Sequence, residues 1–229
     1  MSKAKWWVKV LNIIGIVLMG LTAVATVMAG IGTTCVALAA ENYSSKMALI
    51  APYKWVYVLF VLITTAVGVM GVRATIMLIK RKPGAYSFSL ITLMAGIVIN
   101  VIHVVVSRAI RGSSMPTDGI VYITVFTLII FFIFRIPGIW KEYSRQETDH
   151  EDDGRLAAAF TLVACGVSVL IAPEWFAVSH TFEPGGFNWA NAWPLQMSLT
   201  GILLVLGGLS LAVLPYLRTQ QPKPFTIKR

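Results

Sequence analysis

Six long apolar runs, separated by shorter polar segments, restrict what this chain can fold into. A helix needs about 20 predominantly apolar residues to cross the hydrocarbon core of a bilayer, and it satisfies its own backbone hydrogen bonds there. A transmembrane β-barrel would show segments of about ten residues with alternating polarity, which these unbroken runs lack. The sequence therefore predicts an all-α, polytopic transmembrane helix bundle with six spans, at residues 10–40, 55–79, 88–107, 120–139, 156–172 and 195–217.

Lysine and arginine gather at alternate ends of these runs, and their distribution predicts the orientation of the chain. Cations are retained on the cytoplasmic side of a membrane. With the N-terminus inside, fifteen of the nineteen cations lie on the inner side, and both termini are predicted to be cytoplasmic. Membrane insertion and anionic lipid account for the net charge of +9, so no nucleic-acid partner is predicted. The cations left outside are Lys46, Lys54, Arg108 and Arg111.

The first run has one alternative interpretation. It follows a basic segment and ends in the pattern Ala37-Leu38-Ala39, as a cleavable secretory signal does. Its apolar part is much longer than the roughly 7 to 15 residues of such a signal, which favours a retained span. Cleavage would leave five helices.

The spacing of the runs divides the chain into unequal parts. The first four runs have short connections, whereas a hydrophilic stretch separates the fourth from the fifth. We predict a four-helix transmembrane part at 1–140, an acidic cytoplasmic linker at 141–155, and a two-helix transmembrane part at 156–229 with an aromatic outer loop and a basic tail. The expected location is the plasma membrane of a bacterium or an archaeon.

The third predicted helix differs from the others because it has a polar stripe. Gly96, Asn100, His103, Ser107 and Arg111 follow one another at steps of four, three, four and four residues, which places them on one face of a helix. Amide and ionisable groups within a membrane face protein or water, and they often mark a functional site. The alternative is that Asn100 and His103 only hold this helix against its neighbours.

The outer turn after this helix adds further charges to the same end. Guanidinium groups offer a fork of donors that suits an anionic headgroup, a carboxylate or a quinone oxygen. Asp118 could instead serve only as a helix cap, near Pro116. The predicted ligand-binding residues are Asn100, His103, Ser107, Arg108, Arg111 and Asp118.

The outer loop at 173–194 is unusually rich in aromatic residues. Such residues favour the headgroup layer, so the loop is either an interfacial belt or a surface covered by another subunit. His180 and Glu183 with Glu174 match no strong zinc pattern, and no metal site is predicted. The predicted docking residues are Trp175, Phe176, His180, Phe182, Glu183, Phe187, Trp189 and Trp193.

No catalytic motif accompanies these features. The sequence lacks C-x-x-C, G-x-S-x-G and H-E-x-x-H patterns and a phosphate-binding glycine-rich loop, so no catalytic residue is predicted and no particular cofactor is identified. We expect a non-catalytic accessory or anchor subunit of a membrane complex with a lipid- or quinone-type ligand at the outer half of the third helix. Its partners would be membrane lipid and other membrane subunits or a second copy. The alternative is a small transporter or channel with an outer-facing polar cavity lined by that helix.

Overall fold

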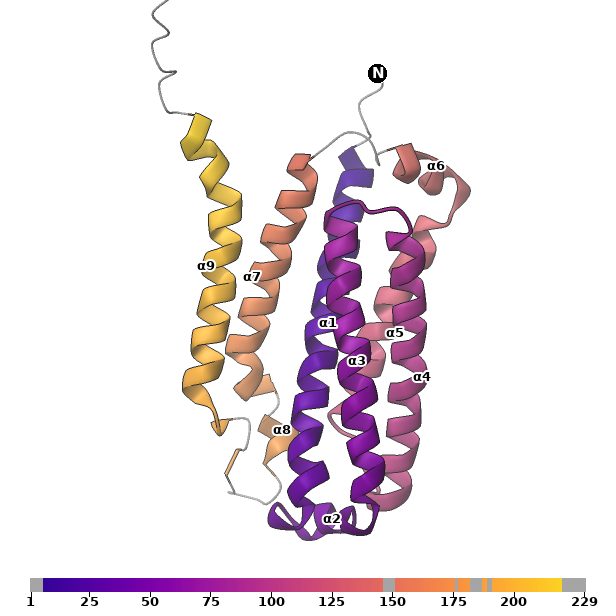
Figure 1. The fold of residues 1–229 in the computed structure, drawn as a ribbon, viewed down its shortest axis with the longest axis vertical. Helices are drawn as coiled ribbons and strands as arrows, with labels where there is room; N and C mark the ends of the chain where they lie inside the picture. Colours follow the sequence, from indigo (N-terminus) through magenta and orange to yellow (C-terminus); the bar gives the residue numbers. More distant parts are fainter. Residues whose placement is uncertain (1–5, 146–150, 176, 182–186, 189–190, 220–229) are drawn as a thin grey trace, which may run out of the picture.

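The computed structural model describes residues 6–145, 151–175, 177–181, 187–188 and 191–219. This part of the chain is all-helical, and its long helices stand side by side as a bundle (Figure 1). The predicted fold class is confirmed as a helical bundle with six helices that are long and apolar enough to cross a membrane. These are α1 (Trp6–Ala39), α3 (Lys54–Ile79), α4 (Ala85–Arg111), α5 (Thr117–Phe134), α7 (Glu151–Trp175) and α9 (Pro194–Thr219).

Helix α1 lies at the centre of the arrangement. It packs against α3, α5 and α7, while α3 packs on α4 and α4 on α5. Helix α9 packs principally on α7 and lies at the edge of the molecule (Figure 1). The beginning of α1 and the end of α9 lie at the same end of the bundle, which we call the inner end after the predicted orientation. The central place of α1 means that its loss would remove the surface on which three other helices pack.

Glycine residues allow α1 and α3 to approach closely. A Cβ atom at Gly68 would lie 2.9 Å from the backbone nitrogen of Val27, and one at Gly71 would lie 3.2 Å from the Cα atom of Ala23. Small residues at such positions let transmembrane helices make close van der Waals contact, because lipid offers no hydrophobic driving force between helices. The contact between α1 and α3 therefore depends on these glycines.

Short helices connect the long ones at both ends. The outer connection between α1 and α3 contains η1 (Ala40–Asn42), α2 (Ser45–Ala48) and η2 (Ala51–Tyr53). Ser44 caps α2 by accepting a hydrogen bond from the backbone nitrogen of Met47 at 3.2 Å. A further short helix, α8 (Ala177–His180), follows α7.

The fourth span ends earlier than predicted. We predicted residues 120–139, but α5 ends at Phe134 and a separate helix, α6 (Pro137–Arg145), follows it. Proline disfavours a helical conformation in the residue before it and is well suited to the first turn of a new helix. Pro137 therefore marks the boundary, and the apolar residues after it belong to α6.

The stretch predicted as an acidic linker, 141–155, is helical at both of its ends. Helix α6 continues to Arg145 and α7 begins at Glu151, while residues 146–150 lie outside the described part of the chain. Tyr143 of α6 stacks on Phe134 of α5, with 5.2 Å between the ring centroids. Helix α6 is thus held against the inner end of the bundle by its aromatic side chains. The division of the chain into four and two helices stays a prediction.

Candidate functional site

The polar stripe of α4 faces the interior of the bundle. Asn100 is fully buried, His103 is 5% exposed, and Ser107 is buried as well. Val101 and Val105, which lie on the opposite side of the same helix, are exposed. We call Gly96, Asn100, His103, Ser107 and Arg111 the α4 stripe. Its buried members are surrounded by protein and do not point at the lipid.

Two aromatic residues of α3 enclose His103. The imidazole stacks on the ring of Phe60, with 4.2 Å between centroids and 14° between planes. Tyr57 meets the imidazole edge-on at 5.5 Å, and its hydroxyl shares a hydrogen bond of 2.9 Å with the hydroxyl of Ser107. Sequence analysis did not single out Tyr57 and Phe60. Their spacing to Thr64 follows one helical face, which is a signal that could have identified them.

Asn100 is only partly satisfied by the protein. Its amide nitrogen donates to the carbonyl oxygen of Gly96 at 2.8 Å, but its Oδ1 atom has no hydrogen-bond partner. Within the described residues, two other buried side-chain atoms lack a partner: Oγ1 of Thr64 and Nε of Arg111. All three atoms belong to α3 or α4. Buried polar atoms normally have a partner in the protein or in ordered water, so this group requires an explanation.

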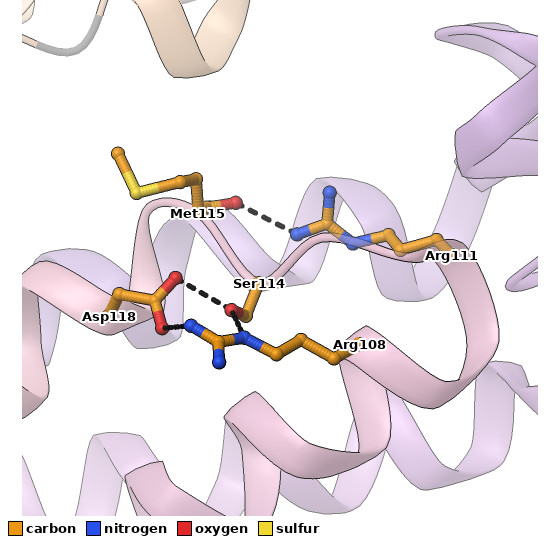
Figure 2. Close-up of polar contacts among 5 residues, drawn as sticks. All are labelled: Arg108, Arg111, Ser114, Met115 and Asp118. Atoms are coloured by element: carbon orange, nitrogen blue, oxygen red, sulfur yellow. Dashed lines mark hydrogen bonds and ion pairs between the residues drawn. The ribbon is translucent and has the colours of Figure 1, made fainter.

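A network of charged and polar side chains ties the end of α4 to the start of α5 (Figure 2). Arg108 donates to the carboxylate of Asp118 at 2.8 Å and to the hydroxyl of Ser114 at 2.8 Å, and Ser114 donates to Asp118 at 2.6 Å. Arg111 points away from this network and donates to the carbonyl oxygen of Met115 at 2.8 Å (Figure 2). Both oxygens of the Asp118 carboxylate are therefore engaged within the turn.

A small cavity lies deeper in the interior, where α1, α3, α4 and α5 meet. Its volume is about 10 Å³, measured to the centre of a water-sized sphere, which is room for about one water molecule. Four threonines line it together with Gly96 and apolar side chains: Thr22, Thr26, Thr92 and Thr124. The hydroxyls of these threonines are already bonded elsewhere: Thr22 shares a hydrogen bond with Thr127, and Thr26, Thr92 and Thr124 donate to carbonyl oxygens of their own helices. The wall of the cavity is therefore almost entirely apolar.

Aromatic side chains of α4, α5 and α6 fill the inner end of the bundle. Phe131 of α5 lies against Tyr86 of α4, whose hydroxyl donates to the Phe131 carbonyl oxygen at 2.7 Å. The guanidinium of Arg135 lies over the rings of Trp140, at 4.8 Å, and Tyr86, at 5.6 Å. The buried polar groups of the α4 stripe therefore lie toward the outer end, whereas the inner end is filled by aromatic side chains.

An apolar groove runs along the outward side of α3 and α4 near the outer end. It has a volume of about 740 Å³ and is open to the surroundings of the bundle. Residues of η2 and α3 form one wall, and residues of α4 form the other. The lining residues are Ala48, Leu49, Pro52, Tyr53, Val56, Val106, Ala109 and Ile110.

The predicted docking surface is described only in part. His180 ends α8 and is half-buried, and Phe187 and Trp193 are exposed. In the described part of the chain, no three His, Cys, Asp or Glu side chains gather closely enough to hold a metal ion. The docking role stays a prediction. Phe176, Phe182, Glu183 and Trp189, and the side chain of Trp175, lie outside the described residues.

Comparison of the chain with protein-family models, with curated proteins and with solved structures finds no match.

Proposed function

We propose that this protein is a non-catalytic accessory or anchor subunit of a membrane complex, located in the plasma membrane of a bacterium or an archaeon with both termini in the cytoplasm. The single observation that supports this role best is the surface of α9 that faces away from α7. One side of this helix packs against α7, and another side remains exposed.

The side of α9 that faces α7 is closely packed. A Cβ atom at Gly208 would lie 2.7 Å from the carbonyl oxygen of Ala159, and one at Gly201 would lie 3.0 Å from that of Gly166. The backbones of α7 and α9 therefore touch along this side. No larger residue fits at these glycines without moving one helix away from the other.

Another side of α9, which turns away from α7, combines small and polar residues with one leucine at regular spacing. Gln196, Thr200, Leu203, Gly207 and Ser210 follow at steps of four, three, four and three residues, and we call them the α9 stripe. All of them except Gly207 are classed as exposed, and a Cβ atom at Gly207 would have no neighbouring atom within 4 Å. Small residues and hydroxyl or amide groups at this spacing are typical of surfaces through which transmembrane helices associate. The α9 stripe supports a contact with another subunit or a second copy.

A matched pair of substitutions tests this proposal. Gly207→Trp places a large side chain on the α9 stripe, whereas Leu209→Trp places the same side chain about 200 degrees round the helix, at a position that is already exposed. Native mass spectrometry of lipid nanodiscs drawn directly from the membrane would measure the assembly. We expect a complex for the natural chain and for Leu209→Trp, and an isolated chain for Gly207→Trp. A lone chain in all three samples contradicts the proposal.

The ligand of this proposal is of lipid or quinone type and is assigned to the outer half of α4. The apolar groove between α3 and α4 supports it, because an acyl or isoprenoid chain matches a groove lined by Val56, Val106 and Ile110. Ala109→Trp would fill the groove from its α4 wall. Mass spectrometry should then detect a co-purifying lipid or quinone on the natural chain and lose it on this variant, and an unchanged ligand mass contradicts the assignment.

The polar interior favours a second candidate function, a small transporter or channel open to the outer side. It predicts that cysteines introduced by Asn100→Cys, His103→Cys and Ser107→Cys react with a polar thiol reagent added from outside, in a chain whose exposed Cys35 has been replaced by serine. Val105→Cys faces away from the interior and should react only with a membrane-permeant reagent. Protection at all three inward positions contradicts this candidate.

A further inference from the structure

We propose that the interface between α3 and α4 is an internal water-binding site that is supplied from the outer side of the membrane. A water molecule bridges Oδ1 of Asn100 and Oγ1 of Thr64. This inference does not depend on either of the functions proposed above, since it concerns what the interior binds and not what the protein assembles with or transports.

The register of α3 against α4 places Thr64 and Asn100, which carry the two unpaired oxygens, at one level. Tyr57 meets Ser107, and Phe60 meets His103. Further inward, a Cβ atom at Gly96 would lie 3.6 Å from a side-chain carbon of Val67. The helices are antiparallel, so the position between these contacts on α3, Thr64, lies level with the position between them on α4, Asn100. Both side chains are more than nine-tenths buried.

The chemistry of these atoms identifies the ligand. Oδ1 of Asn100 can only accept a hydrogen bond, because it is a carbonyl oxygen, and the amide nitrogen beside it donates to Gly96. The hydroxyl of Thr64 can accept and donate. The ligand must be small, must donate a hydrogen bond, and needs no charge, because neither residue is ionisable. Water meets all three conditions, and buried waters typically make about three hydrogen bonds to such groups.

The surroundings indicate the side from which water enters. Toward the outer end the interface continues through His103 and Ser107 to Arg111, whose Nε atom is also buried without a partner. Toward the middle, Val67 and Gly96 line the cavity of about 10 Å³. Beyond the cavity, the aromatic side chains at the inner end are packed against one another. The polar groups of this interface therefore lie between Asn100 and the outer end, whereas the wall of the cavity on the other side of Asn100 is apolar.

Hydroxyl-radical labelling of the natural protein in lipid nanodiscs, read by mass spectrometry, tests the site directly. Radiolysis of bound water marks the side chains beside it. Phe60 lies one helical turn from Thr64 on the same face of α3 and is 5% exposed, and Tyr86, in the inner aromatic cluster, is 8% exposed. Access from bulk solvent alone would label Tyr86 faster. We expect Phe60 to be labelled several times faster than Tyr86, and a Phe60 rate equal to or below that of Tyr86 overturns the proposal.

A valine substitution locates the water. Thr64→Val keeps the shape of the side chain and removes the hydroxyl that holds the ligand. We expect slower labelling of Phe60 and a lower melting temperature, because Oδ1 of Asn100 loses a bridged partner. In a dry interface the same change would remove an unsatisfied hydroxyl, so a raised melting temperature with unchanged labelling overturns the proposal. Thr124→Val is the control, because its hydroxyl donates to the carbonyl oxygen of Ile120, and it should leave Phe60 labelling unchanged.

These readouts remain separate from the test of assembly. Gly207→Trp lies on α9, away from the interface between α3 and α4, and should leave the labelling of Phe60 as it is in the natural chain. Loss of the complex with retained labelling, or the reverse, therefore distinguishes the failure of one proposal from the failure of the other.

Discussion

The α4 stripe and the α9 stripe have nearly the same spacing of small and polar residues, but their surroundings differ. The α4 stripe is covered by Tyr57 and Phe60 of α3, and its Asn100 and His103 are buried. The α9 stripe lies on the side of its helix away from α7, and Gly207 has open space beside it. Helical periodicity therefore identifies a face, but it does not determine whether that face meets another helix of the same chain.

The difference matters because a polar group has different energetic consequences in the two places. Inside the bundle, each donor or acceptor needs a partner, since water is scarce and an unpaired group costs about 1 to 3 kcal/mol. At the edge of the bundle, a hydroxyl can rotate and can meet headgroups, lipid or another helix. We therefore expect equivalent substitutions to lower the free energy of unfolding strongly in the α4 stripe and little in the α9 stripe.

The largest effect is expected from adding a carboxylate to each stripe. Asn100→Asp buries a charge without a cation beside it and removes the amide donor to Gly96, so we expect a loss of about 3 to 5 kcal/mol in the free energy of unfolding. Gln196→Glu, near the beginning of α9, should change it by less than about 0.5 kcal/mol. Denaturant unfolding followed by circular dichroism would measure both. Equal losses would show that the two stripes are equally buried.

A smaller effect is expected from enlarging the small residues. A Cβ atom at Gly96 would make ordinary contacts at 3.6 Å with Thr124 and Val67, so Gly96→Ala should be tolerated. Gly96→Leu needs more room than the adjoining cavity offers, and overpacking should cost about 1 to 3 kcal/mol. Gly207→Leu should leave the stability of the single chain unchanged. Melting temperatures of the three variants would check this order, and a stable Gly96→Leu variant would contradict the packing described here.

The six helices and the inward face of α4 could be predicted from the sequence, but the residues that contact this face could not. The apolar runs and the period of the α4 stripe depend only on local spacing, so six helices and an inward Asn100 follow from them. The end of α5 could have been read from Pro137, although the apolar residues around it concealed the boundary. Phe60 stacking on His103 depends on which helices become neighbours, and local spacing does not encode that choice.

The turn at the outer end illustrates the same limit. Arg108 and Asp118 were both predicted as ligand-binding residues because their charges lie at the end of the α4 stripe. In the structure they meet each other through the turn that contains Ser114, at 2.8 Å. Charge and spacing place the two groups at one end of the bundle, whereas the path of the turn decides that they pair. The ligand-binding role of these residues stays a prediction.

The smallest effect is expected from removing one hydroxyl at each stripe. Tyr57→Phe deletes the hydrogen bond of 2.9 Å to Ser107 and keeps the ring beside His103, so we expect a loss of about 0.5 to 1.5 kcal/mol in the free energy of unfolding. Ser210→Ala deletes a hydroxyl on the exposed side of α9 and should leave that free energy within about 0.5 kcal/mol of the natural value. The double variant Tyr57→Phe with Ser107→Ala should lose no more than Tyr57→Phe alone, because both changes remove the same bond. Additive losses would show that the two hydroxyls act independently, and the enclosure of His103 would then rest on the stacking with Phe60 alone.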